Sequence, residues 1–195
     1  MQSKVLPFSS PTMAQWHTHV NHVQATPTIA DWLSNRDSLT ARLVAHSKAF
    51  RVQRLYQGVA KCLQDEFAEI GLKKAEQVVA REVILRCDER PVVYAHTILP
   101  LTANAHQWPL FAHLGNRSLG TTLFNDPLVQ RGVLHYARLR PAHPLMRRIA
   151  QLSLFEPAQT YLFARRSVFM RHGARLLVTE VFLPTINTLS RYSAV

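Results

Sequence analysis

The chain has 195 residues and a formal net charge of +11, with 47% hydrophobic and 18% charged residues. This length suits one large domain, and the apolar fraction is enough for a core, which excludes a disordered chain. No apolar run approaches the roughly 20 residues that a membrane span needs, and residues 1–11 lack the apolar stretch of a secretory signal. Two isolated cysteines, Cys62 and Cys87, exclude a disulfide scaffold and favour a reduced, cytoplasmic protein.

The N-terminal region differs from the rest of the chain. Residues 1–26 are polar, contain scattered His and Pro, and have no periodicity, so we expect a partly ordered extension followed by one domain over residues 27–195. His17, His19 and His22 have a spacing that resembles that of metal ligands. Because His17 and His19 cannot share one helical face, no metal site is expected there.

Hydrophobic periodicity, capping residues and turn residues indicate the remaining helices and strands. In chain order they predict helices at residues 27–33 and 38–43, a strand at 50–56, a helix at 59–70, strands at 76–87 and 91–99, loops and short helices at 100–126, and strands at 128–139, 160–170 and 175–183. The strands number about six and are mostly joined by hairpins, without a regular βαβ alternation. This pattern predicts a single α+β domain with a largely antiparallel sheet.

Two charged residues lie where these strands are otherwise apolar. Side chains alternate between the faces of a strand, so Arg81 shares a face with Val83 and Glu180 shares one with Val178. A buried charge is costly unless it is paired or binds a ligand. Three interpretations remain open: a buried salt bridge between the two or with other side chains, a face that is exposed to solvent, or an internal cavity in which both residues touch a ligand.

Nine arginines between residues 131 and 175 are accompanied by a single acid, Glu156. They indicate a solvated basic face, a nucleic-acid surface, or the attraction of a small polyanionic substrate. No zinc-finger, RNP or KH pattern accompanies the charge, so nucleic acid is not expected. Dinucleotide-binding, P-loop and GxSxG motifs are also lacking. The turn at residues 118–121 is either an ordinary loop or a set of backbone N–H groups for an anion.

An ordered set of sequence blocks resembles the chorismate pyruvate-lyases, and the match runs from about Asp31 to Pro184. The blocks are DWL at 31–33, SLTARL at 38–43, REVIL at 81–85, AHTILP at 95–100, LG at 114–115, LG at 119–120, LF at 123–124, ARRS at 164–167 and LVTEVFLP at 177–184. The chain departs from the family pattern at Val92, Phe163 and Ser118, where relatives often have Trp, Trp and Pro. These departures affect packing and loop stiffness rather than Arg81 and Glu180.

The resemblance implies an enzyme that removes pyruvate from chorismate to give 4-hydroxybenzoate, which is the entry step to the ubiquinone ring in bacteria. It also implies helices on one side of the sheet and an enclosed site. By the family pattern, Arg81 grips the ring carboxylate, Glu180 meets the ring hydroxyl as a base or only as an acceptor, and the backbone amides of Leu39 and Leu119 complete the site. We therefore expect a monomer with a small-molecule substrate and no cofactor or metal. The alternative is a non-enzymatic sensor domain of the same fold that binds small acids.

Overall fold

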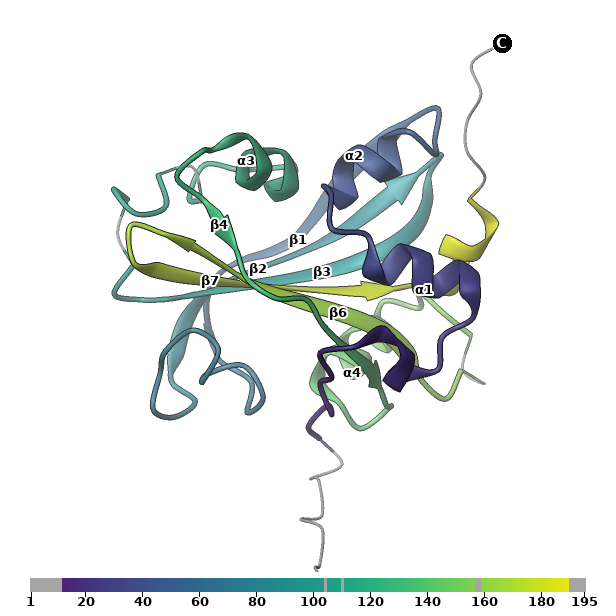
Figure 1. The fold of residues 1–195 in the computed structure, drawn as a ribbon, viewed down its shortest axis with the longest axis horizontal. Helices are drawn as coiled ribbons and strands as arrows, with labels where there is room; N and C mark the ends of the chain where they lie inside the picture. Colours follow the sequence, from purple (N-terminus) through teal and green to yellow (C-terminus); the bar gives the residue numbers. More distant parts are fainter. Residues whose placement is uncertain (1–11, 104, 110, 157–158, 190–195) are drawn as a thin grey trace, which may run out of the picture.

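In the computed structural model, an antiparallel sheet forms the centre of the molecule (Figure 1). The structure describes residues 12–103, 105–109, 111–156 and 159–189, and these contain seven strands. The strands are β1 (Phe50–Lys61), β2 (Gln77–Cys87), β3 (Arg90–Pro100), β4 (Gln130–Arg131), β5 (His135–Leu139), β6 (Leu162–Arg171) and β7 (Ala174–Phe182). Their order is β1-β2-β3-β7-β6-β4, and β5 pairs with the other end of β6.

The α+β class and the single antiparallel sheet are confirmed, with two differences in detail. The predicted strand 128–139 forms two short strands, β4 and β5, which are separated by residues 132–134. The predicted helix 59–70 is wrong. Val59 and Lys61 continue β1 and pair with Val79 and Gln77 of β2, because the ladder hydrogen bonds of a long hairpin outweigh a local helical pattern. The remainder of that segment forms turns as far as Gly71, whose φ is +82°.

Helices cover both faces of the sheet (Figure 1). The helices are α1 (Pro27–Ser34), α2 (Leu39–Val44), α3 (Leu119–Asn125) and α4 (Pro144–Gln151), with 3-10 turns at Val20–Val23 and Pro184–Thr188. The expectation of helices on one side holds for α1, α2 and α3. Helix α4 instead packs Leu145 and Ile149 against Tyr94 on the opposite face, because the central strands are apolar on both faces. Among the described residues, no helix is long and apolar enough to cross a membrane.

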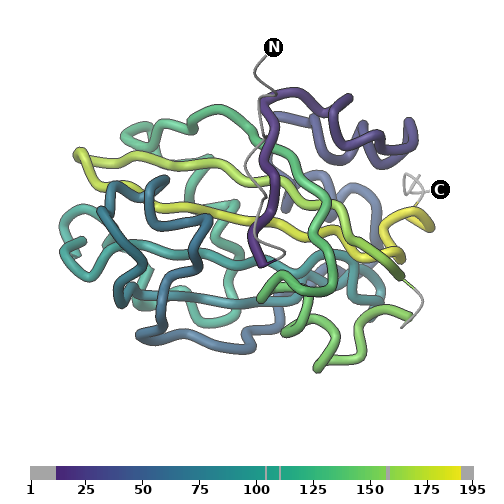
Figure 2. Tube along the Cα trace, turned by 90° about the horizontal axis from the view of Figure 1, so that it is seen from below, coloured from purple at the N-terminus to yellow at the C-terminus, as the bar shows by residue number. Residues whose placement is uncertain are grey.

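The segment that precedes α1 lies across the strands near β5 (Figure 2). His17 forms a bridge with Tyr136 in both directions, with N···O distances of 2.9 and 2.8 Å. Val23 is buried in the same cluster as the apolar residues of α1. The segment 12–26 therefore contacts the rest of the domain through His17 and Val23, while residues 1–11 of the expected extension lie outside the described residues.

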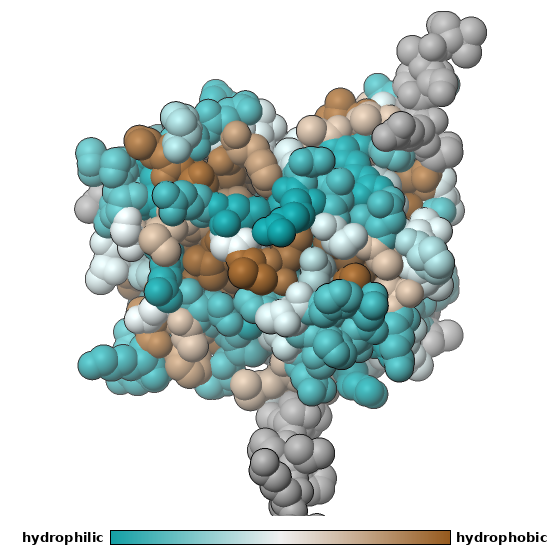
Figure 3. Space-filling model, viewed as in Figure 1, coloured by the Kyte–Doolittle hydropathy of each residue, from teal (hydrophilic) through white to brown (hydrophobic). Residues whose placement is uncertain are grey.

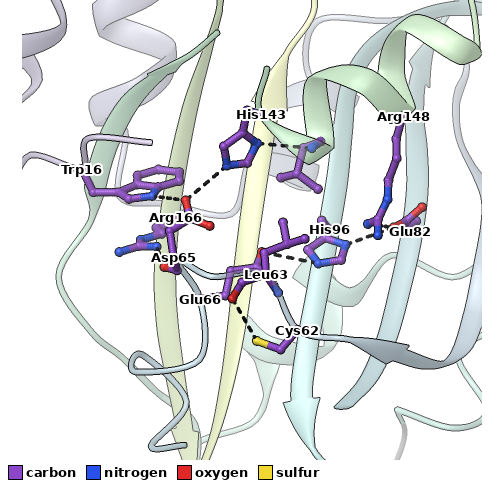
Figure 4. Close-up of polar contacts among 11 residues, drawn as sticks. Trp16, Cys62, Leu63, Asp65, Glu66, Glu82, His96, His143, Arg148 and Arg166 are labelled. Carbon is purple, nitrogen blue, oxygen red and sulfur yellow. Dashed lines mark hydrogen bonds and ion pairs between the residues drawn. The ribbon is translucent and has the colours of Figure 1, made fainter. Parts of the chain in front are cut away.

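A buried network of charges joins the turns at 62–72 to the face opposite α1–α3 (Figure 4). His96 of β3 lies between two carboxylates, with Nε2 at 3.4 Å from Glu66 and Nδ1 at 3.3 Å from Glu82. Glu82 also pairs with Arg148 of α4. In the same layer, Asp65 accepts hydrogen bonds from Trp16 and His143. These contacts tie the turns, α4 and the N-terminal segment to the sheet.

The protonation of His96 makes this network sensitive to alkaline pH. Burial opposes the charged imidazolium, but the contacts with Glu66 and Glu82 outweigh burial and raise the pKa of His96 from 6.5 to about 9. A raised folded-state pKa stabilises the protein fully below pH 6.5, and this stabilisation is lost as pH rises through about 9. Burial raises the pKa of Glu82, but His96 and Arg148 outweigh it and lower the net value, so that contribution is lost in acid instead.

We predict that the melting temperature of the protein falls between pH 7.5 and 10. His96→Gln should lower it at pH 7.5 by about 10 °C, because removal of one partner leaves buried carboxylates uncompensated. The variant should also lose most of the alkaline dependence, since the titrating group is gone. Thermal melts followed by circular dichroism measure both quantities. The exposed His113→Gln is the matched control and should behave as wild type; equal pH slopes in wild type and His96→Gln would contradict this role.

Candidate active site

A cavity lies between the sheet and the helices α2 and α3. It occupies the place where two apolar clusters of the same sheet face meet. Leu85 and Ala95 belong to the cluster that includes α1 and α2, whereas Leu123 and Phe169 belong to the cluster around α3. A mostly apolar cavity with a few polar groups is typical of a site for a small organic ligand.

The floor of the cavity consists of two adjacent rows of paired residues on four strands. One row is Arg81–Thr97–Val178–Ser167 and the other is Val83–Ala95–Glu180–Arg165, in the order β2, β3, β7 and β6. All eight residues line the cavity, and its polar floor residues are Arg81, Thr97, Glu180, Arg165 and Ser167. Arg81 and Glu180 thus share one face and are separated by strand β3.

Arg81 is a buried cation with neutral partners. Arg81 is 2% exposed, and its Nη2 donates to the carbonyl oxygens of Gly115 and Arg117 at 3.0 and 2.9 Å. Its Nε has no hydrogen-bond acceptor among the described residues. Burial, with a smaller contribution from Arg54, lowers the pKa of Arg81 to about 10, so it remains charged at neutral pH. Such a group favours an anionic ligand.

Glu180 is held by a buried arginine. Nε of Arg165 donates to Oε2 of Glu180 at 2.5 Å. Nη1 of Arg165 also donates to the carbonyl oxygens of Trp32, Leu33 and Asn35 at the end of α1. The side chain of Glu180 is 16% exposed and that of Arg165 is 1% exposed. Arg165 therefore links the position of α1 to the orientation of the Glu180 carboxylate.

A third arginine, Arg131 of β4, lies at the edge of the cavity. Its Nη1 donates to the carbonyl oxygen of Arg36 at 2.8 Å, and its guanidinium lies 5.4 and 5.5 Å from the ring centres of Phe124 and Phe169. Among the described residues that line the cavity, three are arginines and one, Glu180, is acidic. The cavity therefore has two positive charges in excess, and it suits a ligand with negative charge.

The roof of the cavity is formed by the first residues of two short helices. Leu39 begins α2, where the Ser38 hydroxyl accepts a hydrogen bond from the Ala41 amide. Leu119 begins α3, and both leucines line the cavity. The first N–H groups of a helix have no acceptor within the helix, so backbone donors lie at the ends of α2 and α3 that border the cavity.

The two helices approach each other closely above the cavity. The hydroxyls of Thr40 and Ser118 are 2.5 Å apart, so α2 and α3 are joined by a side-chain hydrogen bond. A Cβ atom on Gly120 would lie 2.6 Å from Oγ1 of Thr40. The absence of a side chain at position 120 is therefore what allows this contact. Phe124 of α3 is partly exposed beside it, and apolar surface lies around α3 in the space-filling view (Figure 3).

The structure brings together all four residues that the sequence singled out: Leu39, Arg81, Leu119 and Glu180 line one cavity. Of the three interpretations for Arg81 and Glu180, a salt bridge between the two is wrong, because Arg81 contacts carbonyl oxygens. A buried salt bridge with another side chain is confirmed for Glu180, which pairs with Arg165. Exposure to solvent is also wrong, since Arg81 is 2% exposed. A shared cavity is the arrangement observed.

Arg131 and Arg165 were not among the predicted site residues: Arg131 appeared only in the basic run, and Arg165 also in the ARRS block at 164–167. Arg165 and Arg166 are adjacent in β6 and therefore point to opposite faces. Arg166 pairs with Glu69 on the face away from the cavity, at 2.7 Å. The signal in the sequence was the arginine pair inside an otherwise apolar strand, which resembles the context of Arg81.

Comparison with known proteins identifies the family. The model of the family described as chorismate lyase matches residues 10–192. The chain belongs to the chorismate lyase family. Relatives named "Probable chorismate pyruvate-lyase" include one from Cupriavidus metallidurans, 44% identical over 90% of this chain and 82% of the relative, and one from Ralstonia nicotianae, 50% identical over 80% of this chain and 82% of the relative. A third, from Nitrosomonas eutropha, is 42% identical over 93% of this chain and 99% of the relative. Membership of this family makes the protein an enzyme of the lyase class.

Solved structures with a similar fold include an effector domain and a domain of a repressor. The effector domain of PhnF from Mycobacterium smegmatis has a TM-score of 0.52 and 17% identity, over 77% of this chain and 90% of that chain. The C-terminal domain of the histidine utilization repressor from Pseudomonas syringae has a TM-score of 0.52 and 8% identity, over 75% of this chain and 98% of that chain. At this identity the likeness concerns the fold alone.

We predict that Gly120→Ala disturbs the roof of the cavity. The new methyl group would meet Oγ1 of Thr40, so α2 and α3 must separate, and the melting temperature should fall by about 5 °C. Combining Gly120→Ala with Thr40→Ala removes the clashing hydroxyl and should recover part of the loss, so the two changes should not be additive. Thermal melts of both single variants and the double variant measure this coupling. Strictly additive losses would contradict a direct contact between the two positions.

Proposed function

We propose that the protein removes pyruvate from chorismate and releases 4-hydroxybenzoate, as the first step towards the ubiquinone ring. The protein belongs to the chorismate lyase family, and one observation in its structure supports the proposal. Among the described residues, the buried guanidinium of Arg81 has only carbonyl oxygens as partners, and the Glu180 carboxylate lies in the next row of the same cavity floor. An aromatic acid with a carboxylate at one end and a hydroxyl at the other matches this pair.

In the proposed complex, Arg81 binds the ring carboxylate through a charge-assisted contact. The backbone amides of Leu39 and Leu119 donate to the same end of the ligand. Glu180 accepts a hydrogen bond from the ring hydroxyl, while Arg165 fixes the carboxylate by its contact with Oε2. These contacts orient the ring in a cavity from which most water is excluded.

The chemistry requires one elimination. The bond between the ring carbon and the ether oxygen breaks, its electron pair leaves with the enolpyruvyl group, and the neighbouring carbon that bears the hydroxyl loses its hydrogen as a proton. The new double bond makes the ring aromatic, and the proton ends on the methylene carbon of the leaving group, which becomes pyruvate. Aromatisation supplies the driving force, so the task of the protein is to orient and desolvate the substrate.

A nucleic-acid role is not supported by the position of the basic residues. Arg148, Arg165, Arg166 and Arg171 each pair with a carboxylate of the same chain, and Arg131 donates to a backbone carbonyl. Much of the basic run is therefore occupied within the fold. The excess positive charge that remains in the cavity favours a small anion instead.

We expect purified protein to convert chorismate, with the aromatic product followed by ultraviolet absorbance. Arg81→Ala should lower kcat/KM by at least about 100-fold, because the substrate carboxylate loses a buried charged partner. Glu180→Ala should lower it as well, and Glu180→Gln less so, because the amide oxygen still accepts a hydrogen bond.

The exposed Arg140→Ala and Glu76→Gln are matched controls outside the cavity, and both should retain wild-type rates. Absence of product with wild type, or full rates in both Arg81→Ala and Glu180→Ala, would refute the proposed activity. Binding of chorismate without turnover would instead support the sensor alternative.

A further inference from the structure

The cavity contains cationic groups that are not used by the proposed contacts with the ring carboxylate and the ring hydroxyl. Besides Nε of Arg81, two buried donors of the described cavity lining have no acceptor: Nε of Arg131 and Nη2 of Arg165. Both arginines line the cavity. A buried donor without an acceptor costs free energy, so these groups favour a ligand that supplies one.

Both arginines lie on the side of the cavity where Glu180 stands. Arg165 pairs with Glu180 across β6 and β7. Arg131 belongs to the neighbouring strand β4, where it pairs with Phe169 of β6. Arg81, by contrast, is on β2, on the other side of β3. The cavity therefore has two separate cationic regions, one at Arg81 and one at Arg131 and Arg165.

Contacts on three sides hold Arg131 in this position. Its Nη1 donates to the Arg36 carbonyl, and its guanidinium lies against the rings of Phe124 and Phe169. Burial lowers the pKa of Arg131, and the Glu180 carboxylate acts in the opposite direction. The charge of Arg131 is thus within electrostatic reach of the group that is proposed to meet the ring hydroxyl.

The constitution of the substrate places its second carboxylate on the same side. In chorismate the ring carboxylate and the hydroxyl are on opposite ring carbons, and the enolpyruvyl ether is on the carbon next to the hydroxyl. With the ring carboxylate at Arg81 and the hydroxyl at Glu180, the enolpyruvyl carboxylate extends from the Glu180 side. We propose that Arg131, together with Nη2 of Arg165, binds this carboxylate. The inference rests on the proposed function and deepens it.

The charge balance agrees with this assignment. Among the described cavity residues, the three arginines and Glu180 leave two positive charges in excess. The substrate is a dianion, whereas 4-hydroxybenzoate has one carboxylate. When pyruvate leaves, the contact with Arg131 is lost and that with Arg81 remains. Arg131 is therefore a specificity-determining residue that favours the substrate over the aromatic product.

Two equilibria and one rate test this role: the binding of chorismate, the binding of 4-hydroxybenzoate, and the turnover of chorismate. Arg131→Gln should raise the KM for chorismate by at least about 10-fold, because a buried charged contact is lost. It should change the Kd of 4-hydroxybenzoate, measured by calorimetry, by less than about 3-fold, since that ligand does not reach Arg131. Arg81→Ala, in contrast, should weaken both ligands.

Arg131→Lys retains the positive charge and serves as the second variant, with a smaller rise in KM expected; exposed Arg140→Gln is the control, with no change expected. Thermal melts establish that each variant is folded. Equal weakening of both ligands in Arg131→Gln, or no effect on either, would overturn the inference. Failure of wild type to turn over chorismate would refute the proposed function instead, so the two failures are distinguishable.

Discussion

The rest of the site depends on a positive charge buried in the middle of an apolar sheet. Arg81 cannot leave the interior, because it is part of β2 and is paired on both sides, with Gln57 and Thr97. Its guanidinium donates hydrogen bonds to the carbonyl oxygens of Gly115 and Arg117. These oxygens satisfy two hydrogen bonds, but they do not neutralise the positive charge. The remaining cost of desolvation is reduced when an anion enters the cavity, so binding energy is directed to one end of the ligand.

The two faces of the sheet use charge in different ways. In β2 the adjacent residues Arg81 and Glu82 point to opposite faces, and Arg165 and Arg166 do so in β6. On the face away from the cavity, acids and bases are matched, and the contacts of Glu82 and Arg166 hold covering segments in place. On the cavity face, bases outnumber acids. Charged residues within the strands therefore stabilise the fold on one face of the sheet and favour ligand binding on the other.

The sequence predicted which residues line the cavity better than it predicted their positions relative to one another. Arg81 and Glu180 were recognisable because each interrupts an apolar strand, and alternation fixed which neighbours share their face. That they lie on the same face, on either side of β3, depends on strand order, which arises from long-range pairing. The helix expected at residues 59–70 failed for the same reason at its start, since Val59 and Lys61 pair with β2. The turn at Asp88 and Glu89 has φ of +49° and +64° without the usual Gly or Asn.

The most direct test of the central claim is the crystal structure of the protein with 4-hydroxybenzoate bound. The ligand should lie in the cavity beneath α2 and α3, with its carboxylate within about 3 Å of the Arg81 guanidinium and its hydroxyl against Glu180. A ligand bound outside the cavity, or one in the reverse orientation with its carboxylate at Arg131 and Arg165, would contradict the role of Arg81 as the anchor.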